Sequence, residues 1–400
     1  MSKSHSGFSL LLLVAFLAFI SIGLPDAVLG VAWPSIRDSF DRPREDLGFI
    51  LFAAGTGYFT SGIFAGKAIE WLGVGRLLAA STMAVSIGLL GYAVAPGFWF
   101  LLVVAALIGF GSGAVDAGLN FYASEHFSVT VMNWLHAFFG IGAMIGPFIM
   151  AGVLAANASW RVGYLIVAGI TFVMALAFIF TSKQWTDGEH HDHAAKPVTA
   201  AVSVVLQQPL VWLQILIFFC MTGIEACAGA WAYTMLYEKF GIDKGEAGLW
   251  AGFYWGALAL GRIVIAPLTR NMSPARVIQI GTFGLLAGAL MMTRDSVQLY
   301  QAGLLLFGFG MAPLFPTMMS LTPARLGSHV SMHAIGFQVS AAVLGGAAIP
   351  TLAGILAGRS SLNAIPWTLV VGAAVLIGLE TMLRSRADGN EPTVAEVSRA

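Results

Sequence analysis

Apolar residues in this sequence gather into long blocks, which short polar stretches separate. A helix needs about 20 apolar residues to cross the hydrocarbon core of a bilayer, so a block of that length is read as a span. The pattern predicts an all-α polytopic membrane protein of about 12 transmembrane helices. The predicted spans lie near residues 8–32, 47–69, 77–95, 98–122, 132–156, 160–181, 208–236, 247–269, 276–293, 298–321, 331–357 and 363–383.

The composition agrees with a lipid environment. Hydrophobic residues make up 58% of the 400 residues and charged residues only 10%, whereas a soluble domain carries roughly 25% charged residues. Glycine is abundant, at 47 residues, which suits close packing of helices in lipid. The formal net charge is zero, so nothing in the charge indicates a nucleic-acid partner. We expect a monomer embedded in a lipid bilayer.

The spacing of the spans predicts two halves. Residues 182–207 form the one long connection, which is polar at first and lies mid-chain, so we interpret them as a cytoplasmic linker. The predicted domains are a six-helix bundle over 1–181, a second bundle over 208–385 and a cytoplasmic tail over 386–400. We expect residues 8–32 to be a membrane helix rather than a cleaved leader, because further spans follow.

Lysine and arginine residues in the loops predict the orientation. An even number of spans puts both termini on one side, and that side would hold 12 of the 20 Lys and Arg residues. Because loops rich in these residues favour the cytoplasm, we expect both termini there. The expected location is the inner, or plasma, membrane of the cell.

The second half echoes the first at an offset near 200 residues. Four matches occur in order, at offsets of 199 to 202 residues, which chance in a Gly- and Ala-rich chain does not readily explain. Two parallel six-helix halves predict a substrate site between them, near the midplane of the membrane. The matches pair the end of the loop at Arg76 with Arg276, Gly109-Phe110-Gly111 with Gly308-Phe309-Gly310, AGVLA at 151–155 with AGILA at 353–357, and Asp26 with Glu225.

The loop after the second span resembles the loop signature of the major facilitator superfamily. That signature is a glycine, an acid four residues later, and then a glycine and a basic residue, matched here by Gly66, Glu70, Gly75 and Arg76. The resemblance implies a cytoplasmic charge latch that holds one conformation and includes Arg276 in the second half. The alternative is that these are ordinary interfacial loop charges.

Several longer stretches resemble the fucose–proton symporter group within that superfamily. They are LPDAVLGVAWPSIR in the first span, GFGSGAVDAGLN in the fourth, NWLHAFFGIGAMIGP in the fifth and AIGFQVSAAVLGGAAIP in the eleventh. The resemblance implies a sugar or similar polar solute as the substrate, and proton coupling through acids of helices one and four.

Three acids lie well inside the predicted spans, at Asp26, Asp116 and Glu225. A charge at mid-helix costs at least 2.5–3.5 kcal/mol, so such residues are functional candidates. Lys67 and Arg262 sit at helix ends from which their side chains can reach water, so no basic residue is expected to pair with these acids. We interpret the acids as proton-coupling residues; a helix-packing hydrogen bond is the alternative for each.

Polar and aromatic residues in the spans are candidates for substrate binding. Asn120 lies one turn after Asp116, so the two share a helix face. The other candidates are Asn133 and His136 in the fifth span, Gln338 opposite His136 in the repeat, and Tyr254 with Trp255 in the eighth. A satisfied interhelical hydrogen bond or a place in the interfacial aromatic belt is the alternative. Tyr58 and Tyr122 rank below these.

Other chemistries find little support. The run from Glu189 to His193 holds metal-ligand residue types, but we interpret it as a solvated linker and expect no fixed metal site. The nucleotide-binding pattern GxxxxGK[ST] does not occur, so we expect no cofactor, no catalytic residue and no enzymatic activity. The main hypothesis is proton-coupled transport of a small solute. The alternative is efflux of an amphipathic drug or metabolite by proton antiport, because residues 142–147 partly resemble an antiporter signature.

Overall fold

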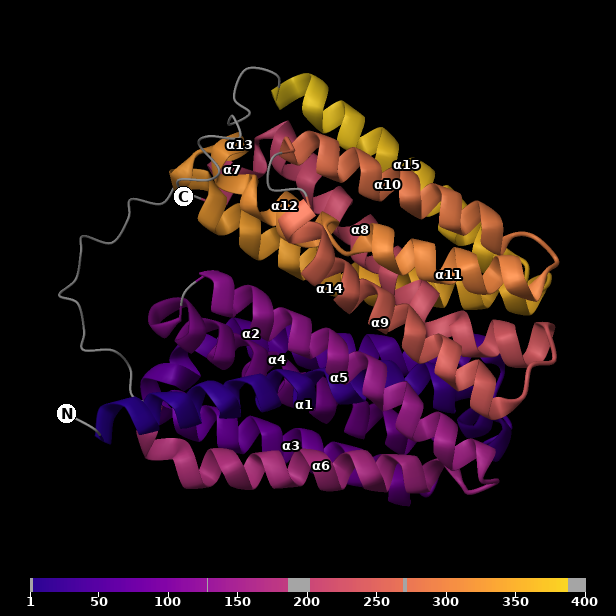
Figure 1. Ribbon diagram of the computed structural model, residues 1–400, viewed down its shortest axis with the longest axis horizontal. Helices are drawn as coiled ribbons and strands as arrows, with labels where there is room; N and C mark the ends of the chain where they lie inside the picture. The colour runs from indigo at the N-terminus through magenta and orange to yellow at the C-terminus, as the bar shows by residue number, and fades with distance from the viewer. Residues whose placement is uncertain (1–2, 128, 186–201, 269–271, 388–400) are drawn as a thin grey trace. The chain divides into compact units, whose positions relative to one another are not determined.

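The computed structural model is helical throughout the residues that it describes, which are 3–127, 129–185, 202–268 and 272–387 (Figure 1). Within them, 12 helical runs are long and apolar enough to cross a membrane. The prediction of an all-α membrane protein with 12 spans is confirmed. The helices are α1 Lys3–Ser39, η1 Arg44–Asp46, α2 Leu47–Leu72, α3 Val74–Val94, α4 Phe98–His126, α5 Val129–Ala155, α6 Trp160–Thr181, η2 Ser182–Gln184, α7 Val202–Leu206, α8 Pro209–Thr234, η3 Met235–Lys239, α9 Lys244–Leu268, α10 Pro274–Met292, α11 Val297–Met311, α12 Leu314–Ser320, α13 Thr322–Leu326, α14 Ser328–Arg359 and α15 Ala364–Ala387.

Proline affects the spans in two different ways. The first span is one helix that runs through Pro25 and Pro34 without interruption. The tenth span, in contrast, consists of α11 and α12 with Pro313 between them. Proline lacks the backbone N–H that continues a helix, which accounts for the break there.

The chain forms two compact units. The first comprises the described residues within Met1–Asp192 together with Ala232–Gly256, and the second those within His193–Trp231 and Ala257–Ala400. The segment 232–256 comes from the second half of the sequence but packs with the first. The two six-helix halves predicted from the repeat stay a prediction. The compact units differ from those halves, because segment 232–256 packs with the first unit.

Helices of the first unit lie along one another, with α1 beside α5 and α6, α2 beside α4, and α3 beside α4 and α6 (Figure 1). Glycine allows the closest approach between α2 and α4. A Cβ atom on Gly57 would overlap the carbonyl oxygen of Ala106, and one on Gly109 would overlap that of Ala54. Small residues at such contacts are the usual means of packing helices in lipid, where apolar burial supplies no force between helices.

The sequence repeat corresponds to a repeated contact inside the two units. In the first unit, a Cβ on Gly111 of α4 would lie 2.6 Å from the carbonyl oxygen of Ser81 on α3. In the second, a Cβ on Gly310 of α11 would lie 2.9 Å from that of Gly281 on α10. The matched residues are 199 and 200 positions apart. The repeat therefore preserves a packing contact and not only a composition.

Two glycines of α2 give a matched test of this packing. We expect Gly57→Ala to lower the stability of the protein by about 1–3 kcal/mol, because the added methyl group meets a backbone oxygen of α4. Gly62→Ala adds the same group where nothing lies within 4 Å, so stability should hold or rise by about 0.5–1 kcal/mol. Thermal unfolding in detergent measures both, and equal effects of the two substitutions would contradict the packing argument.

Candidate functional site

A carboxylate inside the fourth span is held by two neighbouring side chains. Asp116 lies on α4, where its Oδ2 accepts a hydrogen bond of 2.8 Å from the hydroxyl of Tyr58 on α2. Its Oδ1 accepts a bond of 2.8 Å from Nδ2 of Asn120, one turn further along α4. All three side chains are half-buried. Both oxygens of this carboxylate are therefore engaged within the first unit.

Asp26 of α1 adds a second acid to this cluster. Its side chain is exposed on the surface of the first unit, whereas its neighbours Leu24 and Val28 are buried. It lies close enough to Asp116 and Tyr58 to interact with them electrostatically. A charged group that faces lipid at this depth is costly, so the position favours a surface that water reaches.

The cluster therefore joins three residues that the sequence predicts, Asp26, Asp116 and Asn120, with one that it ranked low. Tyr58 ranks low on the sequence alone because the usual place of tyrosine in a membrane protein is the interface. Two signals could have found it. Tyr58 lies in the middle of its span, and Gly57 before it allows close contact with another helix.

The second unit contains one mid-span acid, with a basic partner. Glu225 of α8 is half-buried and interacts electrostatically with Arg262 of α9. The expectation that no basic residue pairs with the three acids is wrong for Glu225. Arg262 lies near the end of its helix, and the reach of its long side chain toward another helix cannot be read from spacing along the chain.

Gln338 belongs to a buried polar cluster in the second unit. Its Nε2 donates to Oε1 of Gln214, and Thr322 Oγ1 donates to the same oxygen at 3.1 Å. Gln338 and Thr322 are fully buried. Nε2 of Gln214 has no hydrogen-bond partner among the described residues. This arrangement gives Gln338 a place inside the unit, and the predicted contact with substrate is untested.

The remaining predicted binding residues lie in varied surroundings. His136 of α5 is half-buried, with its ring edge-on to Phe19 of α1 at 5.4 Å between centroids. Tyr254 is fully buried and meets the half-exposed Trp255 at 5.1 Å between ring centroids. The side chain of Asn133 lies outside the described residues.

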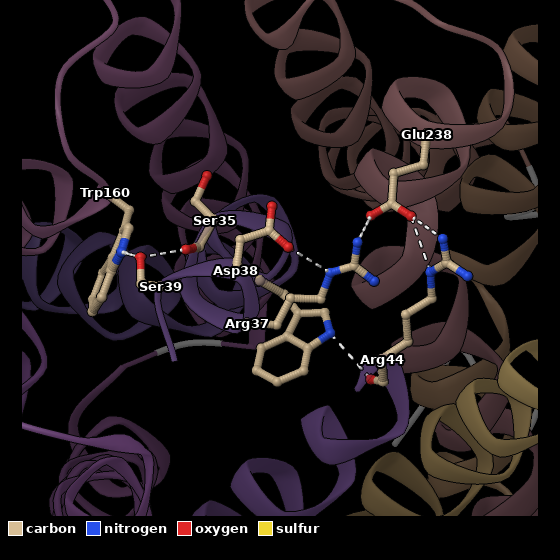
Figure 2. A network of polar contacts seen from close by, with 8 residues as sticks. Ser35, Arg37, Asp38, Ser39, Arg44, Trp160 and Glu238 are labelled. Atoms are coloured by element: carbon tan, nitrogen blue, oxygen red, sulfur yellow. Dashed lines mark hydrogen bonds and ion pairs between the residues drawn. The ribbon is translucent and has the colours of Figure 1, made fainter. Parts of the chain in front are cut away.

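An ion cluster joins α1, η1 and η3 within the first unit. Figure 2 shows the carboxylate of Glu238 between two guanidinium groups. Arg37 forms an ion pair with it at 2.9 Å, and Arg44 donates to its Oε2 from Nε at 3.0 Å and from Nη2 at 2.7 Å. The side chain of Glu238 is only 11% exposed. A residue from the second half of the sequence is thus held by two arginines of the first.

Tryptophan side chains support the backbone around this cluster. Trp33 Nε1 donates to the carbonyl oxygen of Arg44 at 3.1 Å, and Trp160 Nε1 donates to Ser39 Oγ at 2.9 Å. The second contact ties the end of α1 to the start of α6 (Figure 2). The cluster could not be predicted from the sequence, because mixed charges in a short loop carry no information about which of them pair.

The residues predicted to form a latch lie at the ends of spans. Gly73, between Glu70 and Gly75, adopts a left-handed conformation with φ of 71°, which favours glycine. A Cβ on Gly75 would overlap the carbonyl oxygen of Ser182, so the turn between α2 and α3 packs tightly on η2.

The charges of this predicted latch are free in the described part of the chain. Glu70, Arg76 and Arg276 are exposed, and no ion pair links them to described residues. Gly66 is exposed as well. The latch stays a prediction. The histidine-rich run 189–193 lies outside the described residues.

Twelve spans with acids at mid-depth are the features of a secondary transport protein. The chain belongs to the Major Facilitator Superfamily, because the model of that family matches residues 11–235 and 227–398. It is therefore a multi-pass membrane transporter rather than an enzyme, as expected.

Individual known proteins agree with this family. The glucose/mannose transporter of Bacillus subtilis (strain 168) is 21% identical over 385 residues, covering 93% of this chain and 94% of that protein. The structure of a nucleoside transporter aligns with a TM-score of 0.78 at 11% identity, over 94% of this chain and 99% of that one. The E. coli fucose:proton symporter aligns with a TM-score of 0.65 at 18% identity, over 94% and 98%. The resemblance to the fucose–proton symporter group is confirmed at the level of family and fold.

The buried cluster around Gln338 gives a test that separates a structural role from substrate contact. We expect Gln338→Leu to lower stability by about 1–3 kcal/mol, because Gln214 and Thr322 then lose a buried partner. Val339→Ala, at an exposed neighbour on the same helix, should have little effect. Thermal unfolding and ligand binding are measured on the same samples. Weaker binding of substrate by Gln338→Leu with unchanged stability would contradict the structural role.

Proposed function

We propose that this protein moves a small uncharged solute rich in hydroxyl groups, such as a sugar, by proton-coupled alternating access. The observation that carries the proposal is the hydrogen bonding of Asp116 to Tyr58 and Asn120, with Asp26 of α1 within electrostatic reach of Asp116. Every described lysine and arginine of the first unit lies within five residues of the end of a span or outside the spans. The middle of this unit is therefore acidic.

An acidic surface favours substrates that donate hydrogen bonds and disfavours anions. Carboxylate oxygens accept hydrogen bonds from hydroxyl groups, whereas a carboxylate or phosphate ligand needs Lys, Arg or backbone donors. In the described second unit, Arg262 lies near the end of its span and already interacts with Glu225. The charge therefore favours a neutral solute over an anion. The sugars that give the similar glucose/mannose transporter and fucose:proton symporter their names belong to the same class of solute, which supports the proposal.

Proton coupling follows from the chemistry of the cluster. A carboxyl group in an apolar surrounding can take up a proton and release it when its access to water changes. The sequence lacks the phosphate-binding loop of ATP-driven pumps, so an ion or solute gradient is the energy source that we propose. Asp26 and Asp116 are the groups that would exchange the proton, with Glu225 as a further candidate in the second unit.

Efflux of an amphipathic cation is the second candidate, because acids attract cations as well as hydroxyl groups. The motif that suggested efflux has another explanation in the structure. A Cβ on Gly142 would overlap the carbonyl oxygen of Ile20, and one on Gly146 would overlap that of Leu24. These glycines therefore serve the close packing of α5 on α1, and the motif no longer favours an antiporter.

Alternating access requires contacts that break and form at the two ends of the spans. With both termini in the cytoplasm, Glu238 and its two arginines lie at the opposite face of the membrane. We propose that this cluster closes that face. On the cytoplasmic side, the exposed charges of Glu70 and Arg76 in the first unit would serve the predicted latch in the alternative conformation.

Proteoliposomes test the proposed substrate and coupling. We expect an imposed inward proton gradient to drive accumulation of a labelled neutral hexose and not of a hexuronate, because acids line the middle of the first unit. A cationic dye is included to detect efflux. In Asp26→Asn, solute exchange should continue while accumulation driven by the gradient is lost, because exchange needs no net proton transfer.

The outcomes of this assay are distinct. Accumulation of the hexuronate alone would contradict the argument from charge. Movement of the dye against the proton flow would establish efflux instead. A sodium gradient that drives uptake at constant pH would contradict the proton as the coupling ion.

The ion cluster gives a prediction about conformation. We expect Glu238→Gln to expose position 26 to water on the non-cytoplasmic face, because both arginines lose their counter-charge. A partly exposed ion pair contributes about 0.5–1.5 kcal/mol, so the change should be roughly two- to tenfold. The measurement is the alkylation rate of Asp26→Cys by a charged thiol reagent, with Cys220 and Cys227 replaced by alanine.

A local ion pair on the same face is the control for this measurement. Asp46→Asn breaks the contact between Asp46 and Arg42, which joins residues only four positions apart. It should leave the alkylation rate unchanged. Equal acceleration by Asp46→Asn and Glu238→Gln would show that any loss of charge loosens this face, and closure by Glu238 would be wrong.

A further inference from the structure

We propose that the exposed faces of α3 and α6 bind an anionic phospholipid, with Arg76 and Lys183 holding its phosphate group. The site lies apart from the cluster around Asp116, and it takes a membrane lipid rather than the transported solute. The predicted orientation of the chain puts the start of α3 and the end of α6 at the cytoplasmic leaflet, which would supply the lipid.

The exposed sides of the two helices are apolar along their length. They include Ile87, Leu90 and Val94 on α3, and Val173, Ile179 and Phe180 on α6. A continuous apolar surface of this kind marks contact with another molecule or with a membrane. In a chain that spans a bilayer, the acyl chains of lipids are the partner that such a face requires.

Two cations come together at one end of this apolar face. The helices α3 and α6 lie along one another (Figure 1). A Cβ on Gly75 would overlap the carbonyl oxygen of Ser182 and lie 2.8 Å from its Cα atom. Arg76 and Lys183 directly follow these two residues, so their own Cα atoms are at most about 12 Å apart. Their long side chains can therefore reach one phosphate group between them.

Within the described part of the chain, these cations have no counter-charge. Arg76 and Lys183 are exposed and form no ion pair with described residues. Arg161, at the other end of α6, is already engaged, because its guanidinium donates to the carbonyl oxygens of Ala93 at 2.9 Å and Ala95 at 2.8 Å. Two neighbouring cations repel each other, and an anion between them is attracted to both. The cations therefore favour an anionic ligand at this end of the helices.

The two features together select a lipid with a negative headgroup. A guanidinium group can bind phosphate oxygens through two parallel hydrogen bonds. The phosphate of phosphatidylcholine is offset by its own ammonium group, whereas phosphatidylglycerol keeps a net negative charge. Inorganic phosphate lacks the acyl chains that would cover the apolar face. An anionic phospholipid satisfies both the cations and the face.

The second unit repeats this combination. Arg276 lies in the first turn of α10, 200 residues after Arg76, and Arg386 lies in the last turn of α15, which packs on α10. Both arginines are exposed, and so are the apolar Phe283 and Leu290 further along α10. An apolar face with cations at one end therefore occurs in both units, which favours a ligand that surrounds the whole protein, as membrane lipid does.

Photochemical labelling tests the site in the full chain, reconstituted into nanodiscs of phosphatidylcholine. A trace of phosphatidylglycerol with a photoactivatable acyl chain is added, and mass spectrometry measures the labelling of α6. We expect Lys183→Gln to lower this labelling about fivefold, because each basic residue near an anionic headgroup contributes about that factor. Adding Arg76→Gln to Lys183→Gln should lower it about 25-fold.

Lys67→Gln is the matched control, because Lys67 is exposed near the same end of the first unit but lies on α2. It should leave the labelling of α6 unchanged. Equal losses from Lys67→Gln and Lys183→Gln would show diffuse attraction by surface charge and overturn the site. Equal labelling of wild type by a phosphatidylcholine probe would show contact with acyl chains alone, and would overturn recognition of the headgroup.

Inorganic phosphate, added at constant ionic strength, should leave the labelling unchanged. Displacement of the lipid probe by it would show that the cations bind a free anion and would overturn the lipid as the ligand. Lys183 decides the result, because Arg76 also belongs to the predicted latch. Thermal unfolding confirms that each variant is folded. The readout needs no transport, so its outcome is independent of the proposed solute and of proton coupling.

Discussion

The close contact between α2 and α4 is the constraint on which the rest of the candidate site depends. Where helix backbones approach this closely, a side chain at the contact can occupy only a small volume, and glycine meets that limit at Gly57, Gly109 and Gly113. The same approach brings the hydroxyl of Tyr58 to the carboxylate of Asp116. The glycines at this contact therefore determine the chemistry of the site as well as its packing, because they set how close the two helices lie and so which polar side chains can reach each other.

The polar groups of the two units are arranged differently. The first unit collects acids and hydrogen-bond donors at mid-span, whereas Glu225 in the second has a basic neighbour in Arg262. The sequence repeat aligns Asp26 with Glu225, but the repeat preserves the packing contacts more closely than the chemistry. Contacts between backbones tolerate little change, whereas a functional side chain needs only one suitable neighbour, which either half can supply.

Much of the fold and part of the site could be predicted from the sequence. Asp26, Asp116 and Asn120 were identified because charged and polar groups at mid-span are rare and costly. Tyr58 was ranked low and the partner of Glu225 was missed. Both depend on contacts between helices that are distant in sequence, and neither helical periodicity nor hydropathy records which faces of two helices meet.

The sequence by itself determined the number of spans, their helical form, the repeat and the family, since these depend on the length and composition of apolar segments and on local motifs. Only the tertiary structure decided which polar groups share a neighbourhood. It put Glu238, from the second half, between Arg37 and Arg44 of the first. The physical reason is that a hydrogen bond or ion pair depends on distances of a few ångströms between side chains, and those distances exist only once the helices have packed.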